Sequence, residues 1–437
     1  MFILLDCAYL IVLLLISPWL LYKALTTGKY RRGLVAKFLG PSCPAGLHEP
    51  VIWFHGVSVG EIHLLRPVIA TFRRRFPEYS CVVSTTTDTA MEEARKAFSE
   101  LFVFWFPLDF SWAVGRALRR INPKLLVLAE GELWPNLLGA VKRCGVPVAV
   151  INARMSPRSL RRYQQLTVLA RPLVRSLSLI AAQTEDYAAA FRALGANPQA
   201  VRVTGSVKFD GVNSDRRNPK TVALGRLLDV RHGERVWIAG STQEPEEKIS
   251  LAIFRRLRGE YPGLRLFVVP RQKDRFEEVA RLFESSGTPF VRRSALSDIA
   301  ALSRPNAEVI LVDTIGELGA LWGLADVAFV GGSLDGKRGG QNMIEPAGYG
   351  AAVIFGPHVW NFRDTASRLI SAGGACQVEN EADLETAVRH FLTNPHDRQT
   401  IGDRARAFVT SQQGATERTV ALLGDLLLEQ RRGRHAA

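Results

Sequence analysis

Short, continuous apolar runs alternate with longer segments of helical period along most of the chain. Seven such runs begin at Val51, Cys81, Phe102, Leu125, Val146, Leu179 and Val201. After a polar stretch at 211–220, further runs begin at Arg235, Leu264, Glu308, Asp326 and Ala351. Unbroken apolar runs between helices are typical of parallel strands covered on both faces. The pattern predicts an α/β protein with two domains facing each other across a cleft, and ligands at the carboxyl ends of the strands.

The first segment differs, because residues 2–22 are almost entirely apolar and Asp6 is their only charged residue. About twenty apolar residues are enough for one helical crossing of a bilayer. Five basic residues follow: Lys23, Lys29, Arg31, Arg32 and Lys37. By the positive-inside rule the rest of the chain then stays cytoplasmic, whereas a cleaved signal peptide would carry its positive charge before the apolar run. We expect an uncleaved anchor over residues 1–24; Asp6 and Pro18 leave open a monotopic helix that dips into one leaflet.

Composition narrows the class of protein. With 437 residues, 47% of them hydrophobic, the chain is long and apolar enough for two or three packed domains, which excludes a largely disordered protein. Its five cysteines are far apart in the sequence and form no C-x-x-C motif, which excludes a disulfide scaffold and a Cys-rich zinc site. The net charge of +14 favours anionic partners such as phosphates, nucleotides, lipid head groups or nucleic acid.

Glu61 follows the run at 51–59 and begins a predicted helix with apolar residues at helical spacing. A carboxylate in a first helical turn commonly complements the helix dipole. It can also act as a general base where small residues in the preceding loop let a ligand approach. The position alone leaves both interpretations open.

A second acidic position follows the run that begins at Leu125. That run ends at Glu130, Glu132 comes two residues later, and Trp134-Pro135-Asn136 opens the next helix. Packing does not obviously require two acidic residues in such a rigid loop, so the loop is a candidate for function. Lys208 lies in another loop after a strand, where a single lysine is usually just solvated.

Basic and glycine-rich segments supply candidate anion contacts. Residues 152–163 carry four arginines, which form either a solvated helix face or a contact with phosphate or the membrane surface. The segment 331–350 is rich in glycine, so its backbone amides can approach an anion. In it, Asn342 and Glu345 have the spacing of a helix capping box, or else Glu345 contacts the hydroxyls of a ribose.

Familiar metal-binding motifs are missing. The sequence contains no H-E-x-x-H and no D-x-D. We therefore expect no metal and no cofactor, and we expect any catalysis to rely on carboxylate and cationic side chains.

Nine segments, in order along nearly the whole chain, resemble the Kdo transferases of lipopolysaccharide synthesis. They are HGVSVGE (55–61), EGELWPN (130–136), NARMSPRS (152–159), TGSVKFD (204–210), AGSTQEPEE (239–247), VPRQKDRF (269–276), DTIGELG (313–319), GGQNMIEP (339–346) and FGPHVWNFRD (355–364). The resemblance implies a GT-B glycosyltransferase with two Rossmann-like domains and an N-terminal membrane anchor. It assigns the acceptor to a domain at 45–212 and the CMP-sugar to a domain at 220–430. It also implies inverting, metal-independent transfer of 3-deoxy-D-manno-oct-2-ulosonic acid (Kdo) from CMP-Kdo to a lipid A precursor, lipid IVA, at the cytoplasmic face of the inner membrane.

The same resemblance implies roles for individual residues. Glu61 would deprotonate the acceptor hydroxyl, and Glu130 and Lys208 would stabilise the transition state. The CMP contacts would be Pro270, Arg271, Ile315, Gly316, Glu317, Asn342, Met343, Ile344 and Glu345. The sequence departs from the family at Gln341, where many members carry His, and in EGE, where ETE is usual. Gln can still donate a hydrogen bond but cannot carry a proton at neutral pH.

Two other functions remain as alternatives. One is a related membrane-anchored glycosyltransferase that uses another nucleotide sugar. The other is a non-catalytic protein that binds anionic lipid through its basic surface. Nucleic acid is the least expected partner, because the basic residues lack interleaved aromatic residues for stacking.

Overall fold

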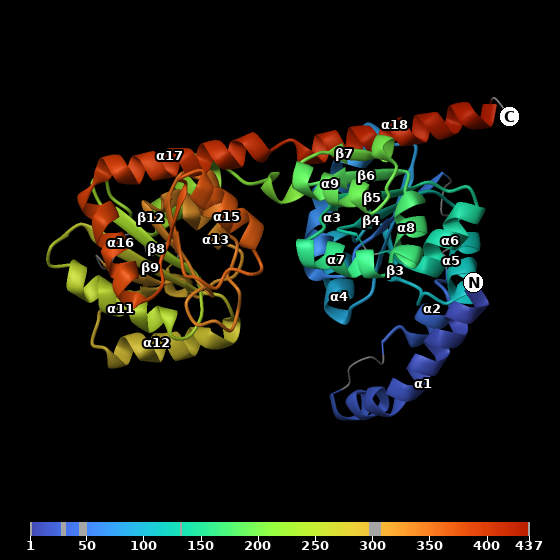
Figure 1. Cartoon of the computed structure of the whole chain (residues 1–437). Helices are drawn as coiled ribbons and strands as arrows, with labels where there is room; N and C mark the ends of the chain where they lie inside the picture. The colour runs from blue at the N-terminus through green and yellow to red at the C-terminus, as the bar shows by residue number, and fades with distance from the viewer. Residues whose placement is uncertain (1, 28–31, 43–49, 132, 297–306, 436–437) are drawn as a thin grey trace. The chain divides into compact units, whose positions relative to one another are not determined.

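The computed structural model describes residues 2–27, 32–42, 50–131, 133–296 and 307–435, and it forms two compact units (Figure 1). The first unit comprises Met1–Asp210 and Gln412–Ala437, and the second comprises Gly211–Ser411. Each unit is an α/β layer structure around one parallel sheet.

The first unit contains a seven-stranded parallel sheet in the order β3-β2-β1-β4-β5-β6-β7. Its strands are β1 (Val51–His55), β2 (Ser80–Thr85), β3 (Phe102–Trp105), β4 (Pro123–Ala129), β5 (Val148–Ala153), β6 (Leu179–Ala182) and β7 (Val201–Val203). Its helices after the N-terminal segment are α3 (Val59–Arg75), α4 (Asp88–Ala97), α5 (Ser111–Ile121), α6 (Pro135–Arg143), α7 (Pro157–Gln165), α8 (Thr167–Arg175), α9 (Glu185–Ala193) and α18 (Ala415–His435). All five residues of β1 are buried, because apolar clusters cover both faces of the sheet. The unbroken apolar runs correctly predicted these strands.

The C-terminal helix α18 belongs to the first unit, which differs from the predicted nucleotide domain at 220–430. Its apolar residues Val420, Leu423 and Leu427 are buried in the same cluster as the inner face of α3. Asp210 accepts hydrogen bonds from the amides of Gly414 and Thr416 at the start of the helix. An apolar stripe at helical spacing predicts that one face of a helix is buried. It does not show against which domain that face packs.

The N-terminal helix α1 (Phe2–Thr27) exposes most of its apolar side chains, and a short helix, α2 (Leu34–Leu39), follows it. By length and composition, Ile3–Thr26 is the one helix among the described residues that is apolar enough to cross a membrane. Asp6 is only 6% exposed, because its carboxylate accepts hydrogen bonds from the Ser111 amide (2.9 Å) and from Asn136 Nδ2 (2.9 Å). The charge that interrupts the apolar segment thus attaches α1 to the starts of α5 and α6.

The second unit repeats the architecture with the strand order β10-β11-β9-β8-β12-β13-β14. Its strands are β8 (Arg235–Thr242), β9 (Leu264–Pro270), β10 (Phe290–Arg292), β11 (Val309–Leu311), β12 (Val327–Val330), β13 (Ala352–Phe355) and β14 (Ala375–Gln377). Its helices are α10 (Pro219–Leu227), α11 (Glu246–Leu257), α12 (Phe276–Ser285), α13 (Leu318–Leu321), α14 (Ile344–Gly348), α15 (Arg363–Ser371), α16 (Glu381–Thr393) and α17 (Pro395–Gln412). The sequence analysis missed β10 and β14, which are three-residue edge strands with partly exposed side chains and therefore no apolar run.

Both sheets contain a point where the chain reverses its direction of winding. In the first sheet this point lies between β1 and β4, and in the second between β8 and β12. The loops after two such strands leave toward opposite faces of the sheet, and ligands of open parallel sheets bind in the crevice between them. The loops that follow these four strands are therefore where chemistry is expected.

Candidate functional site

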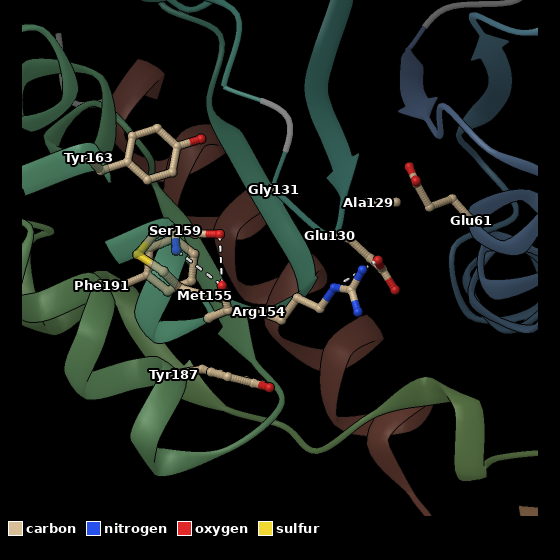
Figure 2. Close-up of a pocket in the computed structure, with 11 residues that line it drawn as sticks. Glu61, Ala129, Glu130, Gly131, Arg154, Met155, Ser159, Tyr163, Tyr187 and Phe191 are labelled. Carbon is tan, nitrogen blue, oxygen red and sulfur yellow. Dashed lines mark hydrogen bonds and ion pairs between the residues drawn. The ribbon is translucent and has the colours of Figure 1, made fainter. Parts of the chain in front are cut away.

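A pocket of about 430 Å³ lies at the carboxyl end of the first sheet (Figure 2). It is lined by Glu61, Ala129, Glu130, Gly131, Arg154, Met155, Ser156, Ser159, Tyr163, Tyr187 and Phe191. Figure 2 shows two ends of different chemistry: Glu61, Glu130 and Arg154 gather at one, and Tyr163, Tyr187, Phe191 and Met155 at the other. Two of the predicted catalytic residues, Glu61 and Glu130, thus line one pocket and follow the two strands at the winding reversal.

Glu130 is held between two cations. Its carboxylate lies 3.0 Å from Lys208 Nζ and 3.2 Å from Arg154 Nε, and its side chain is 15% exposed. The backbone of Glu130 has a φ of 58°, which is uncommon for a residue with a side chain. Its amide nevertheless donates to the Ile151 carbonyl at 3.0 Å, so the strand pairing continues up to the turn. The structure therefore brings the predicted pair Glu130 and Lys208 into direct contact.

Asn152 connects the pieces of this cluster, and the sequence analysis did not single it out. It is fully buried and also has a positive φ, 50°. Its Nδ2 donates to Glu130 at 3.3 Å, and its Oδ1 accepts from the Val207 amide at 3.0 Å. Asn152 thereby fixes the loop that carries Lys208 relative to Glu130. The available signal was an amide side chain inside an otherwise apolar run, since such a group must find partners when buried.

Glu61 lies in the first turn of α3 and is fixed by hydrogen bonds at both carboxylate oxygens. The Val57 amide donates to Oε2 at 2.8 Å and the Ser58 hydroxyl to Oε1 at 2.9 Å. Ser58 Oγ also accepts from the Glu61 amide at 3.3 Å, so the pair caps the helix. A Cβ at Gly56 would lie 3.1 Å from the Glu61 Cβ, which explains the small residue there. Glu61 therefore caps the helix and lines the pocket, and its role as a base remains a prediction.

The histidine before this loop belongs to the core. His55 is buried, stacks on Phe106 at 3.7 Å and places Nδ1 2.9 Å from Ser84 Oγ. Burial lowers the pKa of His55 to about 3, so the imidazole is neutral. Over the part of the chain that the structure describes, no three His, Cys, Asp or Glu side chains come together as a metal site.

In the second unit, the predicted CMP residues lie at the end of β9, in the loop between β11 and α13, and at the start of α14. Pro270 is buried, and the exposed Arg271 directs its Nε to Gln341 Oε1 at 3.2 Å. Ile315 is 75% exposed in the turn with Gly316, whose φ is 92°. Glu317 accepts from Arg293 at 2.7 Å.

The third segment, Asn342 to Glu345, differs from a capping box. Asn342 Oδ1 accepts from the Ile344 amide at 3.1 Å, and its Nδ2 donates to Glu345 Oε1 at 2.9 Å. The residue before the helix is Met343, so Asn342 is one residue too early to be the cap. Burial raises the pKa of Glu345. Met343 and Ile344 are buried, at 0% and 1% exposure, and the contact of these two residues with CMP remains a prediction.

Two features of the first unit singled out in the sequence, Glu132 and the basic segment 152–163, gain no functional assignment from the structure. Glu132 lies outside the described residues. Arg158, Arg161 and Arg162 are exposed on α7, which has no buried residue, so both interpretations of this basic face stay open.

Comparison with known proteins supplies the family. Residues 29–211 match the family model of 3-deoxy-D-manno-octulosonic-acid transferase (kdotransferase). A 3-deoxy-D-manno-octulosonic acid transferase of Haemophilus influenzae is 33% identical over 95% of this chain and 97% of its own length. Another, from Bordetella pertussis, is 35% identical over 89% of this chain and 90% of its own length.

Solved structures show the fold. UDP-GlcNAc 2-epimerase from Neisseria meningitidis, bound to UDP-GlcNAc, matches with a TM-score of 0.59 at 14% identity, over 86% of this chain and 99% of its own. A glycosyltransferase from Rickettsia africae matches with a TM-score of 0.55 at 11% identity, over 86% of this chain and 98% of its own. With two seven-stranded parallel sheets, the predicted GT-B class is confirmed. The chain is a glycosyltransferase and belongs to the 3-deoxy-D-manno-octulosonic acid transferase family.

Proposed function

We propose that this protein transfers Kdo from CMP-Kdo to a lipid A precursor, lipid IVA, with inversion and without a metal ion. One observation carries the proposal: in a chain of this family, Glu61 and Glu130 line one pocket at the winding reversal of the first sheet, and Glu130 is ion-paired with Lys208. The partners of the two carboxylates fit this chemistry. Neutral donors hold the Glu61 carboxylate, and a cation, Lys208, holds that of Glu130.

In the proposed reaction Glu61 takes the proton of an acceptor hydroxyl as its oxygen attacks the anomeric carbon of Kdo. The bond from that carbon to the phosphate oxygen of CMP breaks, and CMP leaves as an anion. A single displacement inverts the anomeric centre. Glu130 offsets the positive charge that develops on the sugar, and Lys208 is placed to neutralise the Kdo carboxylate.

The second unit would hold the donor. Arg271 offers its guanidinium to the phosphate, since within the described residues only its Nε has a partner. Glu317 and Glu345 are carboxylates that could accept from ribose or base donors, and the exposed turn at 315–316 lies directly before Glu317. The first unit would then bind the acceptor and the second the donor, as predicted for the domains at 45–212 and 220–430, except that α18 belongs to the first unit.

The exposed apolar side chains of α1 support attachment to a membrane. The basic residues after this segment favour the cytoplasmic face of the inner membrane. Full-length protein should sediment with membranes and resist alkaline carbonate extraction. Extraction by carbonate would contradict the anchor but not the enzyme activity.

The activity is tested by incubating the purified full chain with CMP-Kdo and lipid IVA and weighing the lipid product. Each added Kdo appears as one mass step, and the reaction should survive EDTA. Donors carrying UDP, GDP or another CMP-sugar should give no product. Product from one of these donors and none from CMP-Kdo would favour the related glycosyltransferase instead, and anionic-lipid binding without product from any donor would favour the non-catalytic protein.

A further inference from the structure

Glu246 is a buried carboxylate whose described partners are all backbone amides. It is the first residue of α11 and is 0% exposed. Oε2 accepts from the amides of Gln243 (2.9 Å) and Gly332 (2.7 Å), and Oε1 from those of Ser333 (2.9 Å) and Leu334 (3.1 Å). An ionised carboxylate offers about four acceptor sites, so this one is fully used. Burial raises the pKa of Glu246, and the four amides oppose that change.

This carboxylate occupies the position where an open parallel sheet usually binds a ligand. Glu246 follows β8, and the three loop amides follow β12, which are the strands at the winding reversal of the second sheet. Successive amides in such a loop form a concave site for an anion. A Cβ at Gly331 would lie only 2.6 Å from Glu246 Oε2, so the loop needs glycine to approach the carboxylate this closely. The sequence analysis noted that amides of this glycine-rich segment can approach an anion, and in the structure the amides of Gly332, Ser333 and Leu334 donate to the carboxylate of Glu246.

The loop that Glu246 holds leads directly into the predicted donor site. The Gly340 amide donates to the Gly332 carbonyl at 2.7 Å, which closes the loop on itself. The next residue is Gln341, which contacts Arg271, and Asn342 to Glu345 follow. A shift of Gly332 would therefore move Gln341 and the residues after it.

We propose that Glu246 is a positioning residue of the donor site: its carboxylate replaces a ligand anion beneath residues 331–334 and fixes the segment 341–345. This inference rests on the proposed function, because it takes that segment as a nucleotide contact. It also excludes the amides of Gly332, Ser333 and Leu334 as donors to the phosphate of CMP, since Glu246 already accepts from them.

The neighbouring residue offers a matched control. Glu247 is also buried, at 1% exposure, in the same helical turn. Its partner is Arg275 Nη2 at 3.1 Å, and no hydrogen bond of Glu247 to the loop 331–334 occurs within the described residues. Removing either carboxylate should lower stability, but only Glu246 should change the donor site.

The first experiment compares CMP binding by calorimetry in full-length wild type, Glu246→Gln and Glu247→Gln. In Glu246→Gln an amide NH₂ faces two backbone N–H groups, so CMP affinity should fall about tenfold or more. Glu247→Gln should stay within about twofold of wild type. Equal losses in both variants, or unchanged affinity in Glu246→Gln, would overturn the inference. Absence of CMP binding by wild type would instead refute the proposed function.

Chemical rescue separates positioning from general destabilisation. Glu246→Ala leaves a cavity lined by four amide donors, and added formate should restore part of its CMP affinity. Formate should do nothing for Glu247→Ala. If a folded Glu246→Ala protein has a reduced CMP affinity that formate does not restore, the proposal that the Glu246 carboxylate takes the place of a ligand anion is wrong.

Hydrogen exchange in wild type tests the same point without any variant. The amides at 332–334 should be protected in the free protein, and saturating CMP should change their protection by no more than about twofold. A large gain in protection at these amides on CMP binding would mean that the nucleotide takes them from Glu246. The inference would then be wrong even if none of the variants fold.

Discussion

The two units place a glutamate at the same point of the same kind of sheet and treat it in opposite ways. In the first unit Glu130 follows a strand at the winding reversal, is 15% exposed, and is held by the side chains of Lys208 and Arg154. In the second unit Glu246 follows β8, the other strand of the winding reversal, has no exposed surface, and is held by four backbone amides. Side-chain partners can exchange during a reaction, whereas backbone amides of packed loops cannot. The first arrangement suits a group that meets substrate, and the second suits one that shapes a loop.

This difference assigns the chemical step to the first unit and donor binding to the second, and substitutions in each unit can test the assignment. If it is right, changes in the first unit lower the rate of transfer and leave CMP binding intact. Changes in the second unit weaken donor binding and leave the chemical step nearly intact. A variant with the opposite effect in either unit would refute the comparison.

The largest effect is expected from Glu61→Gln, which keeps the shape of the helix start but removes the base. We expect kcat to fall by about 10²–10⁴-fold, the usual contribution of a general base. CMP affinity, measured by calorimetry, should stay within about twofold. Glu100→Gln is the control, because Glu100 is an exposed carboxylate of the same unit that pairs with Arg73 at 3.3 Å. Full activity in Glu61→Gln would exclude the proposed base.

The second largest effect is expected from Lys208→Met, which should lower kcat about a hundredfold. The substitution removes a cation that is placed to stabilise negative charge in the transition state. The matched change is Arg154→Met, which removes the second cation on Glu130 and should cost tenfold or less. In a Glu130→Gln background the Lys208 change should have a smaller effect, because the two side chains act as one pair. Independent effects of the two substitutions would show that the ion pair is incidental to catalysis.

Sequence patterns predicted the sheets because parallel strands buried on both faces need unbroken apolar runs. Glu61, Glu130 and Lys208 could be singled out because they follow such runs, and the family resemblance gave them roles. The predicted CMP-binding residues also came from the family resemblance. None of these roles is tested by the geometry, although the structure shows that Glu130 and Lys208 form an ion pair.

Asn152, Glu246 and the packing of α18 were missed for one physical reason. Each depends on partners far away in the sequence: Val207 for Asn152, Gly332 for Glu246, and α3 for α18. A glutamate in a first helical turn is indistinguishable by pattern from an ordinary dipole partner. Only the fold shows that a loop 86 residues later needs its carboxylate.

Arg271→Gln examines the second unit with a smaller effect. Loss of a charge-assisted hydrogen bond to phosphate should raise the Kd for CMP by about ten- to a hundredfold. The rate at saturating donor should change much less, because the residue binds the leaving group in the ground state as well. Arg281→Gln is the control, since Arg281 is exposed on α12 of the same unit. A large fall in kcat with an unchanged Kd for CMP would mean that Arg271 acts in the chemical step. It would contradict the assignment of donor binding alone to the second unit.

Gln341→Ala should produce the smallest change, because it removes one neutral acceptor at 3.2 Å from Arg271 Nε. The arginine would keep its charge and lose only its orientation, so the Kd for CMP should rise by about two- to tenfold. If orientation is the whole effect, the same substitution should do nothing further in an Arg271→Gln background. An additional loss in that background would mean that Gln341 contacts the nucleotide itself, and the amide would then count as a binding group rather than a support for Arg271.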